Sequence, residues 1–173
     1  MAKIIGLDFP SNFRSPLKEV SIINFWRSWH ITLTRFTTGY IFNPITIYFS
    51  KFSYLKKNYF INLFFSILIT FFVIGIWHGS GINFIIFGLL HGLFFLINYY
   101  YRFLKEKINF IIIDKIIFIK IIYWFLTFVS IVIAFIFFRS SNLNQSLIII
   151  KTLLEFDQIV FPITLSDNFI KFL

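Results

Sequence analysis

Residues 59–101 read YFINLFFSILITFFVIGIWHGSGINFIIFGLLHGLFFLINYYY and contain no Asp, Glu, Lys or Arg. Two apolar runs in this stretch, 59–77 and 82–101, are each long enough for a helix that crosses a bilayer, which takes about 20 residues. Gly79 and Gly81 between them predict a tight turn. The stretch therefore predicts a hairpin of two membrane-spanning helices.

Downstream of the hairpin, the sequence predicts one more spanning helix. Residues 102–107 read as a basic loop, and residues 108–120 are apolar but carry charges, so we expect them to be partly interfacial. Residues 121–138 form the third uncharged run. Residues 147–156 have the periodicity of a short amphipathic helix.

Upstream of the hairpin, an amphipathic pattern runs to about Phe36. Ser15 and Pro16 are predicted to begin this helix, because Ser is a favoured N-cap and Pro suits the first helical position. We expect it to lie in the membrane interface or to enter the bilayer obliquely. Residues 37–50 contain Gly39 and Pro44 and are predicted to be a broken or re-entrant segment.

The composition supports an integral membrane protein. Of the 173 residues, 58% are hydrophobic and 13% are charged, whereas soluble domains carry roughly 25% charged residues. There is no cysteine, which excludes a disulfide scaffold, a Cys-ligated metal site and a Cys nucleophile.

The positive charge is placed at the ends of the apolar runs. The formal net charge is +9, and basic residues bracket the hairpin: Lys51, Lys56 and Lys57 before it, and Arg102, Lys105 and Lys107 after it. This is the positive-inside pattern, so both ends are predicted to be cytoplasmic. Nucleic acid is not an expected partner.

Two Trp-His pairs contain the candidate catalytic residues: FWRSWH at residues 25–30 and GIWHG at residues 75–79. Burying a polar group without partners is costly, so an ionisable side chain within a membrane segment is by default a functional candidate. A neutral imidazole can act as a general base near neutral pH. Loose backbone N–H groups at the glycine turn after His78 could stabilise an oxyanion.

Structural interpretations of the same residues remain open. His78 and His91 could each be hydrogen-bonded structural residues, and for His91 this is the favoured interpretation. Trp26 and Trp29 are equally typical of interface anchors. The three histidines have no metal-ligand spacing, so no metal site is predicted.

The chain resembles the membrane-bound O-acyltransferase (MBOAT) family, in the branch of the alginate O-acetylation protein and the teichoic acid D-alanyl transfer protein. The resemblance covers about residues 6–156. Four stretches carry it: residues 9–13 leading to 25–34, residues 40–44, residues 75–79 through 87–92, and residues 137–140. It implies an all-α fold in which this chain is part of a larger bundle of about ten spanning helices.

The resemblance also implies roles for individual residues. His78 matches the catalytic base of the family, and His30 matches a second histidine that lines the same reaction tunnel. The surrounding motif residues, expected to bind substrate, are Trp26, Arg27, Trp29, Trp77 and Gly79, together with His91, whose family role is less clear. Residues 37–40 read TTGY where relatives often have Arg-Asp before the tyrosine, so a substrate contact of the family is absent here.

The implied function is transfer of an acyl group from a thioester donor to a hydroxyl of an exported envelope polysaccharide, such as an alginate-like glycan or peptidoglycan. The expected donor is acetyl-CoA, with no bound cofactor. The expected partners are membrane lipids, a periplasmic acetyltransferase and a missing N-terminal half. The expected location is the bacterial inner membrane.

We divide the chain into a motif region (1–58), a transmembrane region with the histidine hairpin (59–138) and a C-terminal tail (139–173), all within one partial MBOAT domain. Two alternatives remain at this stage. The chain could be an inactive C-terminal fragment or accessory subunit of a split enzyme, or a small transporter component with a proton relay through His78 and His91.

Overall fold

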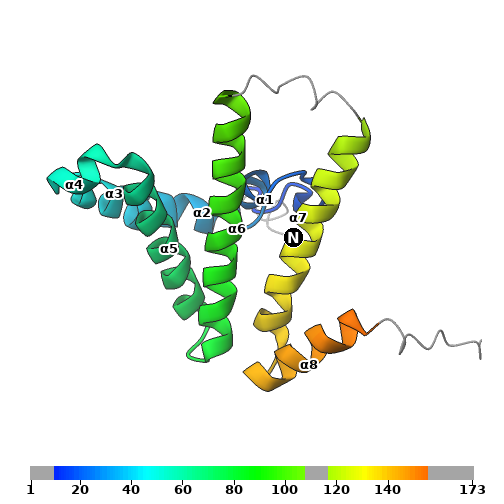
Figure 1. The fold of residues 1–173 in the computed structure, drawn as a ribbon. Coiled ribbons are helices and arrows are strands. Elements are labelled where there is room, and N and C mark those ends of the chain that lie inside the picture. Colours follow the sequence, from blue (N-terminus) through cyan, green and yellow to red (C-terminus); the bar gives the residue numbers. More distant parts are fainter. Residues whose placement is uncertain (1–9, 108–116, 156–173) are drawn as a thin grey trace, which may run out of the picture.

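The computed structural model describes residues 10–107 and 117–155, and all regular structure in these ranges is helical (Figure 1). The elements are η2 (Pro16–Lys18), α1 (Ile22–Ser28), α2 (Ile31–Thr37), η3 (Thr38–Phe42), α3 (Asn43–Phe49), α4 (Ser53–Lys57), α5 (Tyr59–His78), α6 (Ile82–Lys107), α7 (Ile117–Arg139) and α8 (Leu143–Leu154). Within these ranges, α5, α6 and α7 are long and apolar enough to cross a membrane. The prediction of an all-α membrane protein with three spans is confirmed.

The α5–α6 hairpin is held by direct contact between the two helix backbones. A Cβ atom added to Gly88 would lie 2.3 Å from the Phe71 carbonyl oxygen and 3.0 Å from the Gly75 Cα. A Cβ atom on Gly75 would lie 2.4 Å from the Phe84 carbonyl oxygen. Small residues allow such close approach in membranes, where packing rather than the hydrophobic effect drives helix association. The two glycines therefore set the crossing point of the hairpin.

The N-terminal region differs from the single amphipathic helix predicted to begin at Ser15. Ser15 has a left-handed backbone (φ 49°) and caps only the short η2 turn, without a side-chain hydrogen bond. The first α-helix begins at Ile22, where Ser21 is the N-cap and its Oγ accepts the Asn24 N–H at 3.3 Å. The predicted helix is also divided at Trp29 and His30, which separate α1 from α2.

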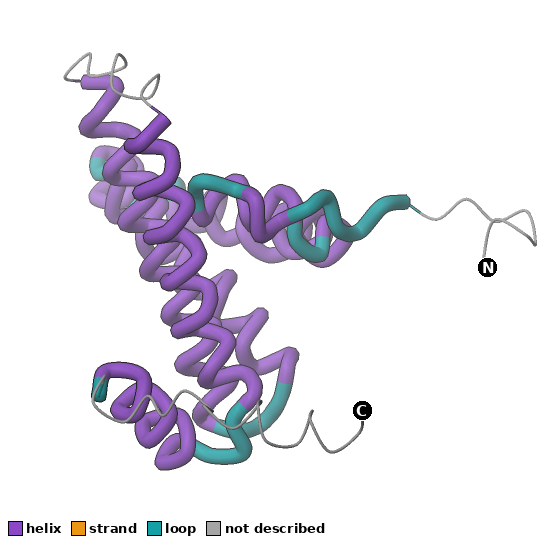
Figure 2. Tube along the Cα trace, turned by 90° about the vertical axis from the view of Figure 1, so that its right-hand side faces the viewer, coloured by secondary structure: helices purple, strands orange, loops and turns teal. Residues whose placement is uncertain are grey.

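Residues 37–50 are predicted to be broken or re-entrant; the structure keeps residues 37–49 helical, without a break. From α2 the chain passes through the π-helical turn η3 directly into α3. Pro44 lies at the start of α3, and in a regular α-helix its ring would clash with the carbonyl of Tyr40. The π turn η3, which comes just before α3, is wider than an α-helical turn. It therefore accommodates the Pro44 ring without a break in the helix. Figure 2 shows these short N-terminal helices extending to one side of the long ones.

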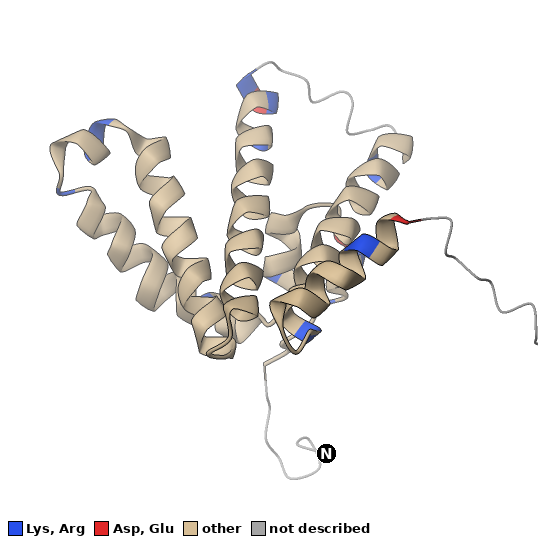
Figure 3. Cartoon of the chain, turned by 60° about the horizontal axis from the view of Figure 1, so that its bottom comes forward, with Lys and Arg blue, Asp and Glu red and all other residues tan. Residues whose placement is uncertain are grey.

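The predicted basic loop at residues 102–107 is the last part of α6, which is helical to Lys107. Long basic side chains at a helix end can reach the interface while their stems stay on apolar surface, so the helix need not stop at the first charge. Residues 108–116 lie outside the described ranges, and residues 117–120 begin α7. Figure 3 shows Lys and Arg at this end of α6, near the start of α7 and around α4.

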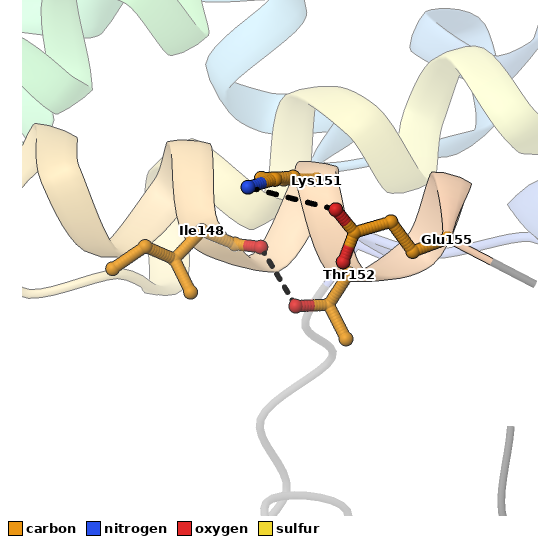
Figure 4. A network of polar contacts seen from close by, with 4 residues as sticks. All are labelled: Ile148, Lys151, Thr152 and Glu155. Atoms are coloured by element: carbon orange, nitrogen blue, oxygen red, sulfur yellow. Dashed lines mark hydrogen bonds and ion pairs between the residues drawn. The ribbon is translucent and has the colours of Figure 1, made fainter. Parts of the chain in front are cut away.

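The amphipathic helix α8 begins at Leu143, four residues before its predicted start. Asn142 is its N-cap, because its Oδ1 accepts the Gln145 N–H at 2.9 Å. The exposed side of α8 carries an ion pair between Lys151 and Glu155 at 3.6 Å (Figure 4). The predicted end at residue 156 lies outside the described residues.

Candidate active site

His78 is the last residue of α5 and stands at the tip of the hairpin. Its partly buried imidazole contacts three aromatic rings, with centroid distances of 4.8 Å to Trp77, 5.1 Å to Phe138 and 5.6 Å to Phe87. Gly79 follows in an extended conformation, and its N–H donates to the Ile76 carbonyl at 3.2 Å. The imidazole is thus enclosed by rings from its own helix, α6 and α7.

His30 lies at the corner between α1 and α2 in a left-handed conformation, with φ 43°. This conformation is uncommon for a residue other than glycine and is often found where a functional side chain must be aimed. His30 is the N-cap of α2 but makes no side-chain capping bond. Asn12 supplies the cap instead, because its Oδ1 accepts the Thr32 N–H at 2.9 Å. The His30 imidazole is therefore not used in holding the helix.

His91 is fully buried in a cage of five aromatic rings. The ring centroids lie between 4.8 and 6.4 Å from that of the imidazole; the rings belong to Phe25, Trp26, Phe71, Phe87 and Phe135. Neither His91 nitrogen has a hydrogen-bond partner among the described residues. The environment is that of a core residue rather than of an open binding site.

Phe87 links the surroundings of His78 and His91, since its ring lies 5.6 Å from the first imidazole and 4.8 Å from the second. Phe138 contacts both Phe87 and His78, and Phe135 contacts both His91 and Trp29. We call Phe87, Phe135 and Phe138 the phenylalanine hub. The hub joins α6 and α7 to the Trp29 corner and excludes water between the two histidines.

The structure brings the two predicted Trp-His pairs into one neighbourhood. Trp29 packs on Phe135 at 5.5 Å, and Phe135 packs on Phe138 at 5.8 Å. Phe138 in turn contacts His78 at 5.1 Å, so a chain of ring contacts connects the two pairs. Buried polar atoms without a described partner also gather in this region: Trp26 Nε1, His30 Nδ1, Asn83 Oδ1 and both His91 nitrogens. Such atoms are costly to bury and give the region hydrogen-bonding capacity that a bound substrate can satisfy.

A cavity of about 580 Å³ lies beside this region, between the N-terminal helices and the α5–α6 hairpin. Its size suits a small-molecule site. The polar residues of its wall include the charged residues Arg27, Arg102 and Glu106 and the threonines Thr34, Thr37, Thr38 and Thr70. Trp26 is shared between the cavity and the His91 cage. None of the three histidines belongs to the described lining, so the cavity adjoins the imidazoles without containing them.

The remaining predicted site residues lie further out. The Trp77 side chain is 64% exposed and covers one side of His78. Arg27 is exposed at the edge of the 580 Å³ cavity. Gly79 faces the Phe84 ring, because a Cβ atom there would lie 2.4 Å from it. These three residues border the site rather than form its interior.

Sequence reasoning missed several residues that shape the site. Of the phenylalanine hub, Phe87 and Phe138 lie in stretches that carried the family resemblance, whereas Phe135 could not be told apart among 28 phenylalanines. Asn83 is buried, and its Nδ2 donates to the Ser140 carbonyl at 3.1 Å. Asn12 and Ser140 each lie in a stretch that carried the family resemblance, which was the available signal for both.

Comparison with known proteins gives a family match and several relatives. The sequence model of MBOAT, the membrane-bound O-acyltransferase family, matches residues 2–140. A peptidoglycan O-acetyltransferase of Helicobacter pylori is 37% identical over 155 residues, which cover 87% of this chain and 27% of that protein. The probable alginate O-acetylase AlgI of Pseudomonas syringae pv. tomato is 32% identical, with 82% and 24% covered.

A teichoic acid D-alanyltransferase of Bacillus subtilis is 30% identical over 88 residues, covering 51% of this chain and 22% of that protein. The chain therefore spans about a quarter of the length of the curated relatives it matches.

Proposed function

Because the chain belongs to the membrane-bound O-acyltransferase family, we propose that it carries the reaction centre of an enzyme that moves an acyl group from a thioester to a hydroxyl. The proposed acyl group is acetyl and the proposed donor is acetyl-CoA. The proposed acceptor is an exported envelope polysaccharide. The names of the relatives from Helicobacter and Pseudomonas support peptidoglycan or an alginate-like glycan.

The observation that carries this proposal is the position of His78 at the hairpin tip, enclosed by aromatic rings that connect it to Trp29 beside His30. In the proposed reaction, a ring nitrogen of His78 takes the proton of the acceptor hydroxyl while the oxygen attacks the thioester carbonyl carbon. The tetrahedral intermediate expels the thiolate, and the proton passes from His78 to that sulfur. Ester and thiol are the products.

Other residues of the site would support this step without exchanging a proton themselves. His30 would orient the acceptor or donate a hydrogen bond to the developing oxyanion. The hub rings Phe87 and Phe138 would keep water away, which protects the thioester from hydrolysis. Trp26 and Arg27 would hold substrate in the 580 Å³ cavity, because both residues belong to its lining.

We place the protein in the bacterial inner membrane, with the basic ends of the hairpin in the cytoplasm. The positive-inside pattern supports this orientation. It would give a thioester donor access from the cytoplasm and leave the acceptor on the far side. We further propose two partners, the remaining helices of an MBOAT bundle and a periplasmic acetyltransferase that passes the acyl group to the glycan.

A second candidate is that the chain is an accessory or inactive segment of a split enzyme, which would lack acyl transfer of its own. A transporter with a proton relay has no comparable support. Both His91 nitrogens lack a described hydrogen-bond partner, and the ring that contacts both His91 and His78 is Phe87, which has no exchangeable proton.

The proposal is tested by introducing His78→Ala, His30→Ala and Lys151→Gln into the gene in its own host and measuring acetyl esters on the envelope glycan. We expect ester to be lost with His78→Ala and strongly reduced with His30→Ala. Lys151 lies on the exposed side of α8, so Lys151→Gln should retain ester. Protein levels in the membrane are measured for each variant. Retained ester with His78→Ala would refute the proposal.

A second arm separates an enzyme from an accessory segment. The chain is expressed in a deletion strain with and without the product of the neighbouring upstream reading frame. Ester that depends on both products and on His78 supports a split acyltransferase. Absence of ester in both cases, with both proteins present in the membrane, supports the inactive segment.

A further inference from the structure

A second cavity, of about 700 Å³, lies between α6 and α7 with the start of α1 behind it. Figure 1 shows α1 behind the space between the two long helices. We call this cavity the α6–α7 groove. It shares Arg102 and Glu106 with the 580 Å³ cavity but lies on the other side of α6, away from the hairpin partner α5.

The two ends of the groove differ in chemistry. Toward the end of α6 and the start of α7 it carries three cationic residues, Arg102, Lys105 and Lys120, and one carboxylate, Glu106. Further into the membrane its lining is mainly apolar, with Phe94, Ile97 and Leu126, and it includes the hydroxyls of Thr127 and Ser130. From Phe94 to Lys105 the rise along α6 is about 16 Å at 1.5 Å per residue. The groove is thus an amphipathic slot aligned with the helices.

The cationic end is held in place by the surrounding structure. One nitrogen of Arg102 donates to the Ser21 Oγ at 2.8 Å and to the Asn24 Oδ1 at 3.2 Å, which ties α6 to the start of α1. The Lys105 Nζ lies over the Tyr101 and Tyr123 rings, 5.9 and 5.5 Å from their centroids. The hydroxyls of these two tyrosines are 2.5 Å apart, which links α6 to α7 across the groove.

We propose that the α6–α7 groove binds an anionic phospholipid of the cytoplasmic leaflet, with the phosphate at Lys105 and Lys120 and an acyl chain along the apolar lining. Basic pockets between transmembrane helices on the cytoplasmic side are suited to anionic headgroups. A soluble phosphate would use only the cationic end, whereas a lipid also covers the apolar part near Phe94 and Leu126. This proposal does not depend on acyl transfer.

The test measures lipid binding by the protein after extraction from its own membrane. Native mass spectrometry compares phosphatidylglycerol with phosphatidylcholine of the same acyl chains, for the unaltered protein and for Lys105→Gln and Lys120→Gln. The matched control is Lys56→Gln, since Lys56 lies on α4 at the same predicted face of the membrane but outside the groove. Circular dichroism confirms that each variant keeps its helix content.

We expect phosphatidylglycerol to bind in preference to phosphatidylcholine, and each groove variant to bind it about fivefold more weakly. Lys56→Gln should bind as the unaltered protein does. Equal binding of the two lipids, or an equal loss with Lys56→Gln, would overturn the proposal, because either result indicates unspecific attraction. Displacement of the lipid by soluble glycerol phosphate would assign the cationic end to a free phosphate instead.

Discussion

Asn12 caps the helix that begins directly after His30, because its Oδ1 accepts both the backbone N–H of Thr32 at 2.9 Å and its hydroxyl at 2.7 Å. The Asn12 carbonyl also accepts the Ile31 N–H at 3.0 Å. Asn12 lies eighteen residues before His30 in the sequence. It thus accepts the backbone N–H groups at the start of α2, to which the His30 imidazole makes no hydrogen bond. The conformation of His30 therefore depends on a residue distant from it in sequence.

Asn12→Ala should lower both stability and acyl transfer. Removing an N-cap typically costs about 1 kcal/mol, and here it also releases the corner that holds His30. Asn142→Ala is the matched control, since Asn142 caps α8 through an equivalent bond to Gln145. Thermal unfolding in detergent should show similar losses for both variants, and ester measurements should show reduced transfer only for Asn12→Ala. Full transfer with Asn12→Ala would contradict the dependence of His30 on this cap.

Gly88→Ala should weaken the α5–α6 hairpin. Its new methyl group would meet the Phe71 carbonyl oxygen at 2.3 Å, a backbone atom that moves only with its helix. Overpacking of this kind costs about 1–3 kcal/mol. Gly39→Ala is the control, because no atom lies within 4 Å of its added Cβ. The melting temperature should fall for Gly88→Ala and not for Gly39→Ala; equal melting temperatures would show that the helices can separate without loss.

Gly79→Ala should disturb His78 through two phenylalanine rings. The new methyl would displace the Phe84 ring, whose edge lies 2.4 Å away. Phe84 packs on Phe138 at 5.6 Å, and Phe138 contacts His78 at 5.1 Å. We expect ester formation to fall with Gly79→Ala.

Two further variants make this prediction specific. Gly81→Ala should retain activity, because its Cβ would contact the same ring only at an ordinary 3.7 Å. Adding Phe84→Leu to Gly79→Ala should restore activity by making room for the methyl group. No recovery in the double variant would mean that Gly79 acts by another route, such as close approach of substrate to its backbone.

His91→Phe should keep or raise the melting temperature, whereas His91→Ala should lower stability by about 3 kcal/mol. The imidazole fills an aromatic cage, and its two nitrogens have no described partner, so a phenyl ring removes an unpaired polar group and preserves the packing. A protein that fails to fold with His91→Phe would show that a nitrogen is paired in the intact enzyme. Ester formation in the same variant then reports whether the imidazole takes part in the reaction.

The three spanning helices and the glycine turn could be predicted from sequence, because long uncharged runs have few alternatives in a bilayer. The break between α1 and α2 at His30 could not be predicted, because neither Gly nor Pro marks it. The cap of α2 comes from Asn12, which is distant in sequence. The π turn before Pro44 and the continuation of α6 past Arg102 also depend on neighbours, the first on local sterics and the second on packing against α1.

The candidate site was predictable to the extent that its residues carry rare side chains. Histidine and tryptophan are uncommon enough in apolar segments to be noticed. The structure places four of them in one region: His78, His30, Trp26 and Trp29. The ring contacts that separate His78 from His91 could not be foreseen, because one phenylalanine in such a chain resembles another. Which phenylalanines contact the histidines is decided only by the packing of α7 on α6.

The length of α5 has a consequence for the direction of the chemistry. Its 20 uninterrupted residues from Tyr59 to His78 measure about 30 Å, the thickness of the bilayer's hydrocarbon core. The length of the helix therefore places the His78 imidazole about one hydrocarbon thickness from the basic end of α5, next to Lys56 and Lys57. A thioester donor that docks at that end would therefore have to reach about 30 Å along α5 to meet the imidazole.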